Sequence, residues 1–188
     1  MNIARIKRAC LEAGTVAVMH TEEGDWIGNG SAWWTCDGQR FNEDQIVAMM
    51  GLTAKQRAKI PFEETTPGDA GFDEADFTQV SDATDELLKR ETTICFDGGS
   101  TIGVYRSRNA DRPQAWIIPE ERFAPVQGKE GTEMALRRCV DGSSLMIAAR
   151  GYLTVGITRP FERDGEVAAS IVRGLLTIAN TITGGETK

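Results

Sequence analysis

The first part of the chain shows a helical spacing of apolar residues that then changes to an alternating one. At the amino terminus, apolar residues recur every three or four positions, at Ile3, Ile6, Cys10 and Ala13. Asparagine is a common N-cap and glycine a common helix end, so the pattern predicts a helix between Asn2 and Gly14. The alternating pattern around Val16 and Val18 then predicts a strand over 15–20.

A second strand is predicted over 26–34, after a turn at Glu23-Gly24. It carries three of the four tryptophans and two glycines, namely Trp26, Trp33, Trp34, Gly28 and Gly30. Glycines weaken a strand unless a bulge or a closely approaching group requires them. Two interpretations stay open: the indoles fill the core, or they form an exposed surface that docks a protein partner.

The order of helix then hairpin recurs twice more. A predicted helix over 81–90 precedes strands at 92–96 and 101–107, and a predicted helix from Thr132 to Gly142 precedes strands at 144–149 and 153–158. Other patterns predict short helices at 41–50 and 53–60, a strand at 114–118 and a carboxyl-terminal helix from Asp164 that packs on the sheet. The predicted fold is α+β, with antiparallel hairpins in one or two sheets packed against helices and with candidate helix–hairpin repeats.

Negative charge is concentrated in one segment. Residues 61–92 hold ten acidic side chains against Lys89 and Arg90, a charge of −8, so the remaining 18 acids and 19 bases leave the rest of the chain near neutral. Within it, residues 62–80 mix Pro, Gly and carboxylates. This composition predicts an exposed acidic loop or linker, anchored by Phe72 and Phe77, that separates 1–61 from 81–188 within a single domain.

Cysteine usage and hydropathy favour a cytoplasmic protein. The cysteines are isolated in sequence and are expected to stay reduced, with Cys36 the most reactive because it lies near the end of the tryptophan hairpin; the four are Cys10, Cys36, Cys95 and Cys139. No stretch has the length and apolarity of a signal peptide or a membrane span, so no contact with a membrane is expected.

The sequence favours neither metal binding nor catalysis. His20 is the only histidine, and no Gly-x-Ser-x-Gly elbow presents a serine nucleophile. We therefore expect no catalytic residue, no metal and no cofactor.

One short stretch offers an alternative. Residues 94–103 read ICFDGGSTIG, and this strand–turn–strand pattern resembles the first phosphate loop of the actin and sugar-kinase superfamily. In that superfamily the aspartate orders a metal-bound water, while the glycines let backbone amides approach phosphate. The resemblance implies a phosphate site made of Asp97, Gly98, Gly99, Ser100 and Thr101. The superfamily needs a second such loop, which this chain lacks, so a plain hairpin turn is the favoured interpretation.

Arginine is common between 106 and 159. Four arginines at predicted hairpin ends, Arg106, Arg108, Arg112 and Arg150, form a candidate stripe along a nucleic-acid backbone. Guanidinium groups bind phosphates bidentately, which favours this interpretation. The alternative is a set of solvated turns whose arginines pair with neighbouring carboxylates.

The opening helix, the stretch WIGNGSAWW at 26–34 and the stretch LTVGITRP at 153–160 resemble small proteins of phages and mobile elements in Gram-positive bacteria. Some of those proteins are similar to halves of DNA sliding clamps, in which helices line a ring and hairpins form its outer sheets. The resemblance implies a replication accessory with DNA or a replication protein as partner. A chain of this length holds too few units for a ring, so a homo-oligomer is expected as well.

The favoured hypothesis is thus a non-enzymatic binding or assembly factor, in the form of a clamp-like replication accessory. Two alternatives stay open: a protein-interaction module that uses the tryptophan hairpin, and a small phosphate- or nucleotide-binding enzyme that uses residues 97–101.

Overall fold

The computed structural model describes residues 2–77, 84–95, 101–109, 115–128 and 130–160. Its helices are α1 (Ile3–Ala13), α2 (Glu43–Met50) and α3 (Ala54–Arg57), with two short 3-10 helices, η1 (Glu74–Phe77) and η2 (Glu120–Arg122). Its strands are β1 (Val16–Thr21), β2 (Gly24–Gly28), β3 (Ala32–Thr35), β4 (Phe62–Thr65), β5 (Glu86–Cys95), β6 (Thr101–Ser107), β7 (Ala115–Pro119), β8 (Thr132–Arg138), β9 (Ser144–Arg150) and β10 (Leu153–Thr158). No helix among the described residues is long and apolar enough to cross a membrane.

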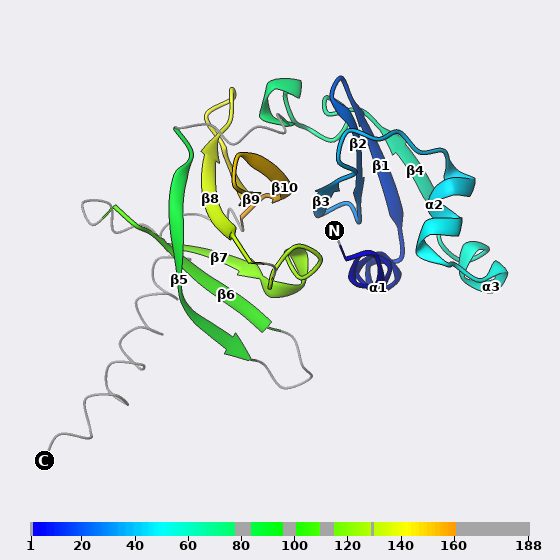
Figure 1. Ribbon diagram of the computed structural model, residues 1–188, viewed down its shortest axis with the longest axis horizontal. Coiled ribbons are helices and arrows are strands. Elements are labelled where there is room, and N and C mark those ends of the chain that lie inside the picture. Colours follow the sequence, from blue (N-terminus) through cyan, green and yellow to red (C-terminus); the bar gives the residue numbers. More distant parts are fainter. Residues whose placement is uncertain (1, 78–83, 96–100, 110–114, 129, 161–188) are drawn as a thin grey trace, which may run out of the picture.

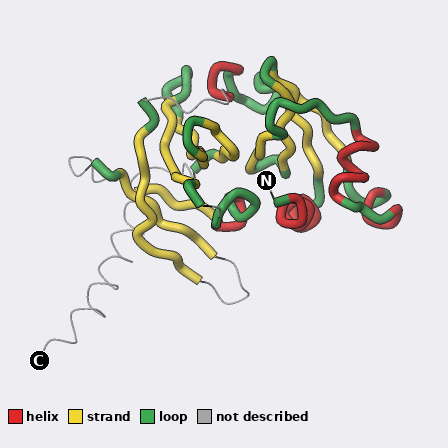
Figure 2. Tube along the Cα trace, viewed as in Figure 1, coloured by secondary structure: helices red, strands yellow, loops and turns green. Residues whose placement is uncertain are grey.

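The described strands form one sheet in the order β4-β1-β2-β3-β10-β9-β8-β5-β6-β7 (Figure 1). All neighbours are antiparallel except β1 and β4, which are parallel. Helices and a large antiparallel sheet agree with the α+β prediction, although strands dominate (Figure 2).

Two three-stranded meanders meet in the middle of this sheet. The first, β1-β2-β3, follows α1, and the second, β8-β9-β10, follows the η2 turn segment, residues 120–128. Their last strands pair antiparallel, with Trp34 opposite Gly156 and Trp33 opposite Ile157. The amide of Asn2 donates to the carbonyl of Pro125 at 3.1 Å, so α1 and the η2 turn segment are in contact.

The two faces of the sheet bury different clusters. One face places Val18, Ile27 and Trp34 in a core with Ile6 of α1 and Phe123 of the η2 turn segment. The other face buries an apolar row that Ala70 and Phe72 partly cover; its members include Ala17, Trp33, Ala135, Ile147 and Ile157. Strand alternation produces this division, since neighbouring residues of a strand point to opposite faces.

Capping side chains explain where the helices begin. The Asn2 carboxamide oxygen accepts from the Arg5 amide, and Gly14 ends α1 in the left-handed conformation at φ 76°. Asn42 and Thr53 each start a helix with a reciprocal capping box, to Gln45 and Gln56 respectively. The predicted helices at 2–14, 41–50 and 53–60 are therefore confirmed, with α3 shorter than expected.

Several predicted elements are wrong. The helix predicted from Thr132 is strand β8, and residues 86–90 of the helix predicted over 81–90 belong to β5. Residues 62–65, expected in an exposed loop, form β4 beside β1. The predicted strand over 26–34 is two strands joined by a turn at 29–31, because Asn29 Oδ1 accepts from the amides of Ser31 and Ala32.

Other predicted strands are confirmed. They are the hairpin of β5 with β6, the strand β7 and the hairpin of β9 with β10. The helix predicted from Asp164 lies outside the described residues.

A buried ion pair fixes part of the acidic segment to the sheet. Arg137 of β8 donates from Nε and Nη2 to the two carboxylate oxygens of Asp85, at 3.0 and 2.8 Å. The Arg137 guanidinium also donates to the hydroxyl of Thr154 and to the carbonyl of Asp76. Asp76 is itself buried and accepts from the amide of Val140. This part of the segment is therefore structural rather than a free linker.

Candidate nucleic-acid interface

The sheet opens into a fork between β5 and β8. Strand β5 pairs with β6 from Leu88 to Cys95, whereas it pairs with β8 only from Glu86 to Leu88. Beyond Leu88 the two strands diverge, and a pocket of about 470 Å³ lies at this point. Because the two strands separate here, side chains from both faces of the sheet line the pocket.

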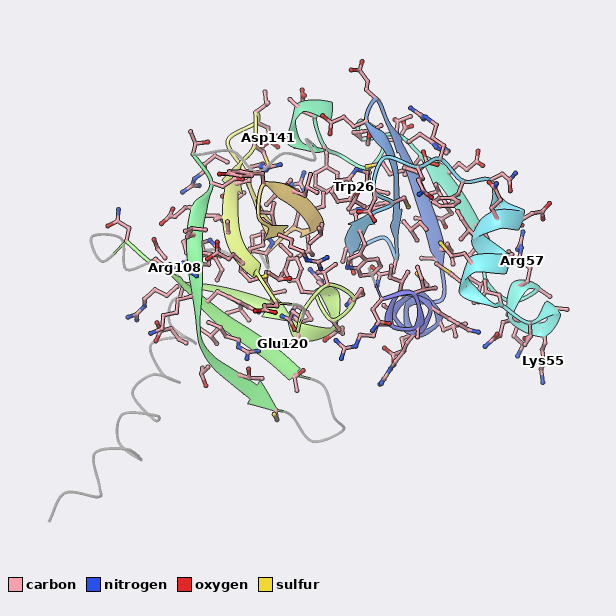
Figure 3. The ribbon with its side chains drawn as sticks, viewed as in Figure 1. Trp26, Lys55, Arg57, Arg108, Glu120 and Asp141 are labelled. Carbon is pink, nitrogen blue, oxygen red and sulfur yellow. The ribbon has the colours of Figure 1, made fainter. Side chains whose placement is uncertain are left out.

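Four cationic side chains from three parts of the chain line the fork pocket: Arg5, Lys89, Arg90 and Arg108. Arg5 comes from α1, two come from β5, and Arg108 follows β6. Arg108 is placed by its amide, which donates to the carbonyl of Leu87 at 2.9 Å. Figure 3 shows Arg108 at the end of the molecule opposite Lys55 and Arg57 of α3.

Carboxylates and a carbonyl hold these cations in place. Arg90 Nη1 contacts Glu120 Oε1 at 3.1 Å, and Arg108 Nη1 contacts Glu133 Oε1 at 3.1 Å. Lys89 is 3.7 Å from Glu91, and Arg5 Nη1 donates to the carbonyl of Ala124 at 2.7 Å. Four cations therefore face three carboxylates, which leaves one net positive charge. The side chains of Lys89, Arg90 and Arg108 are about half exposed or more, so these pairs are weak and can exchange for phosphate.

Tyr105 forms part of the pocket wall. Its hydroxyl accepts from Gln127 Nε2 at 3.1 Å. Burial, with a smaller contribution from the charge of Glu120, raises the pKa of Tyr105 to about 12, so the hydroxyl stays protonated at neutral pH. A Cβ at Gly103 would lie 2.6 Å from both the Tyr105 ring and Glu120 Oε1, so glycine is needed there. Tyr105 thus contributes a neutral hydroxyl to a pocket that four cationic side chains also line.

Of the four arginines predicted to bind DNA, Arg108 alone lines the pocket among the described residues. Arg106 lies opposite Lys89 in the β5–β6 register, and Arg150 lies opposite Thr132, which lines the pocket. Arg112 lies outside the described residues. Arg106 and Arg150 therefore lie beside residues of the fork pocket without lining it, and DNA binding by the predicted stripe stays a prediction.

The tryptophans belong to the core. Trp26 and Trp34 are 0 % exposed and Trp33 is 4 % exposed, so the prediction of an exposed docking surface is wrong and the core interpretation is confirmed. Trp34 Nε1 donates to the carbonyl of Arg122 at 3.0 Å, which joins β3 to the η2 turn segment. Of the candidate phosphate loop, Thr101 starts β6, whereas Asp97, Gly98, Gly99 and Ser100 lie outside the described residues.

Within the described ranges, no three His, Cys, Asp or Glu side chains come together in a way that could hold a metal ion. His20 Nδ1 lies 2.9 Å from the buried Asp25, whose second oxygen accepts from the amide of Phe41. This arrangement ties β1 and β2 to the start of α2.

No protein-family model, no curated protein and no solved structure matches this chain.

Proposed function

We propose that this chain is a non-enzymatic factor that binds the phosphate backbone of nucleic acid through the fork pocket. The observation that carries the proposal is the convergence of Arg5, Lys89, Arg90 and Arg108 on one opening of the sheet. Arginine forks bind phosphate oxygens bidentately, and exposed ion pairs exchange at little cost. A phosphate that enters the fork replaces the carboxylates that now hold these side chains.

A clamp-like arrangement is the favoured form of this function. Two meanders that join through β3 and β10, with α1 and the η2 turn segment on the same face, support it. In such an arrangement the helical side faces the nucleic acid. On that side α1 exposes Arg5 and Arg8, of which Arg5 reaches the fork pocket. Several copies are needed to surround a duplex, so the proposal includes a homo-oligomer.

Salt-dependent binding tests the proposal. Fluorescence anisotropy with a labelled DNA duplex should show affinity that falls steeply between about 50 and 200 mM salt. The double variant Lys89→Ala with Arg108→Ala should bind more weakly and should flatten the dependence on salt, since each lost phosphate contact reduces the slope by about one.

The matched control is Lys55→Ala with Lys59→Ala, which removes two exposed lysines at the α3 end of the molecule. This variant should keep the wild-type slope. Equal weakening by both double variants would assign binding to overall charge rather than to the fork. Binding that does not depend on salt, or no binding at low salt, would overturn the proposal.

A further inference from the structure

The turn between β9 and β10 exposes an aromatic ring. Tyr152 is 84 % exposed and its neighbour Leu153 is 55 % exposed, in contrast to the buried Trp26 and Trp34. Gly151 begins this two-residue turn at φ 59°, a conformation that favours glycine. Core packing does not account for a ring this exposed, so the ring of Tyr152 can stack on a group from outside the chain.

The strand register places this turn beside the fork pocket. Arg150, the last residue of β9, pairs with Thr132 of β8 on one side and with Leu153 of β10 on the other. Thr132 lines the fork pocket. The turn that carries Tyr152 therefore continues the pocket on its β8 side.

A further cation precedes the turn. The Nε and Nη2 atoms of Arg150 have no hydrogen-bond partner within the described ranges, so no carboxylate there accepts from them. Four more cationic side chains line the pocket next to it, namely Arg5, Lys89, Arg90 and Arg108. A row of cations that ends at an exposed ring suits a polymer with phosphates along its backbone and flat groups attached to it.

A single strand of nucleic acid has this chemistry. Neighbouring strands of a sheet are about 4.8 Å apart, and successive phosphates of one nucleic-acid strand are about 3.4 Å apart along its axis, so a few nucleotides reach from the turn to the cations of β5. In a duplex the bases stack on one another, whereas unstacked bases of a single strand are open to an aromatic side chain. The exposed ring thus favours a single strand over a duplex.

We propose, on the basis of phosphate binding at the fork, that the preferred nucleic acid is single-stranded and that one of its bases stacks on Tyr152. Its backbone passes from the fork pocket across the end of β8 to the turn, with its phosphates toward the cations. Every base has a π-face, so stacking on Tyr152 discriminates little between sequences. Base stacking at this turn does not require the clamp-like form.

Fluorescence anisotropy with three labelled probes of equal length tests the base contact. The probes are oligothymidylate, an abasic strand with the same phosphates, and a duplex. At one fixed salt concentration, oligothymidylate should bind about tenfold more tightly than the abasic strand, because one stacked base contributes about that factor. It should also bind more tightly than the duplex. Equal affinities for oligothymidylate and the abasic strand, or tighter binding of the duplex, would overturn the proposal.

Variants of the two turns of β9 locate the contact. Tyr152→Ala should abolish the preference for oligothymidylate over the abasic strand, and Tyr152→Phe, which keeps the ring, should restore it. Val140→Ala is the matched control, because Val140 is a 70 % exposed apolar residue in the turn before β9; it should keep the wild-type preference. A preference that survives Tyr152→Ala would refute stacking on this ring.

The double variant Lys89→Ala with Arg108→Ala separates the base contact from the phosphate contacts. It should weaken binding of oligothymidylate and of the abasic strand alike, since both carry the same phosphates. If this variant weakens both probes but the wild-type protein does not distinguish them, stacking on Tyr152 is refuted and phosphate binding at the fork stands. If the wild-type protein binds none of the probes, both are refuted.

Discussion

Burial of individual thiols decides their chemistry. Cys10, Cys36 and Cys139 are at most 7 % exposed, whereas Cys95 is exposed at the end of β5. Burial raises the pKa of Cys10 to about 12, and burial together with the charge of Asp25 raises the pKa of Cys36 to about 12. The thiolate is the reactive form, so the prediction that Cys36 is the most reactive cysteine is wrong.

Alkylation at neutral pH should therefore modify Cys95 first. Cys36 should react only when the chain unfolds, because its thiol is both protonated and covered. Peptide mass mapping after brief iodoacetamide treatment, with and without urea, measures this order. Labelling of Cys36 in the folded protein at the rate of Cys95 would contradict the burial described here.

Two positions of the tryptophan hairpin, 28 and 30, require glycine for different reasons. A Cβ at Gly28 would lie 2.4 Å from the Trp33 ring and 2.7 Å from the Ala32 carbonyl, so this glycine makes room for the indole. Gly30 has open space around it but adopts φ 80°, which favours glycine in the turn between β2 and β3. The sequence shows that something must approach this strand closely. It does not show that the strand breaks.

At the scale of elements, helices and strands were predicted best where the signal is local, as with a capping residue or an alternating strand pattern. Asn2 and Thr53 each start a helix as expected, the helix predicted over 41–50 begins after an Asn42 cap, and strands β9 and β10 were recognised. The helix predicted from Thr132 failed because Met, Ala, Leu and Arg are good helix formers, whereas pairing with β9 over the whole length of β8 decides its conformation. Strand β4 was missed because its pairing with β1 is parallel and distant in sequence.

The same limits apply to the fork. Lys89 and Arg90 lie at the end of the helix predicted over 81–90, yet they follow the last β5 residue that pairs with β8. Arg5 joins them only because α1 packs beside the η2 turn segment. Arg108 was recognised since it follows a strand that the alternation predicts. The convergence of these four residues is a property of strand order, which local patterns do not contain.

The buried ion pair between Arg137 and Asp85 should contribute strongly to the free energy of unfolding, because it holds the acidic segment on the sheet. Arg137→Met leaves the Asp85 carboxylate, 2 % exposed in the native pair, without its cation. Loss of one partner of a buried pair typically costs about 3–5 kcal/mol. Arg138→Met is the matched control, because that side chain is exposed and donates to the Ser144 hydroxyl; it should cost about 1 kcal/mol or less.

Urea unfolding of the two variants measures the difference. Combining Arg137→Met with Asp85→Ala should recover part of the loss, since the uncompensated charge is then removed. Equal midpoints for the Arg137 and Arg138 variants would mean that the buried pair does not stabilise the fold.

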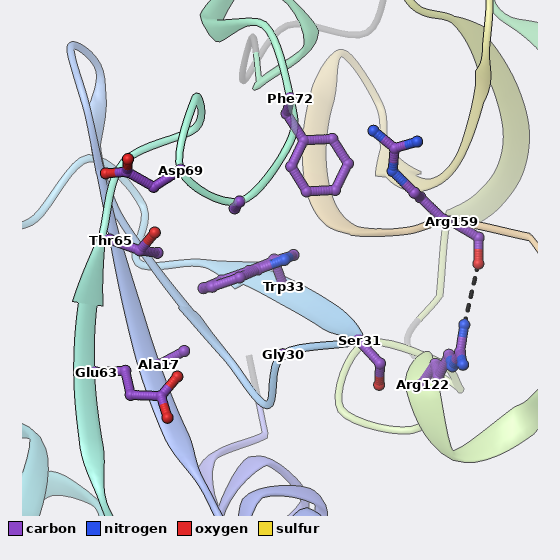
Figure 4. Close-up of a pocket in the computed structure, with 11 residues that line it drawn as sticks. Ala17, Gly30, Ser31, Trp33, Glu63, Thr65, Asp69, Phe72, Arg122 and Arg159 are labelled. Atoms are coloured by element: carbon purple, nitrogen blue, oxygen red, sulfur yellow. Dashed lines mark hydrogen bonds between the residues drawn. The ribbon is translucent and has the colours of Figure 1, made fainter.

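At the scale of the molecule, one sheet joins two meanders through β3 and β10. The fork lies between β5 and β8, and another cavity, lined by Trp33 of β3, lies on the other side of this join (Figure 4). The core of the first face includes Cys10 of α1, Cys36, which follows β3, and Tyr105 of β6. Ionisation of these groups therefore acts on the packing of both halves of the sheet.

Alkaline pH should destabilise the protein through these three groups. Their pKa values rise from 9.0 for the cysteines and 10.0 for the tyrosine to about 12 in the folded chain, chiefly because burial disfavours the charged form. The unfolded chain thus releases these protons first, and the folded chain holds more protons above about pH 9. The stabilisation is complete below the unfolded pKa values and is lost as pH rises toward about 12.

Urea unfolding between about pH 7 and pH 11 should show a free energy of unfolding that falls with pH in the upper part of this range. Cys10→Ala with Cys36→Ala lowers stability at every pH through lost packing, but it should make the alkaline decline shallower, because two of the three groups no longer ionise in the unfolded chain. Cys95→Ala is the matched control, since that thiol is exposed and its loss should leave the decline unchanged. A free energy that stays constant to about pH 11, or a decline of the same slope in the double variant, would show that these thiols do not couple protonation to folding.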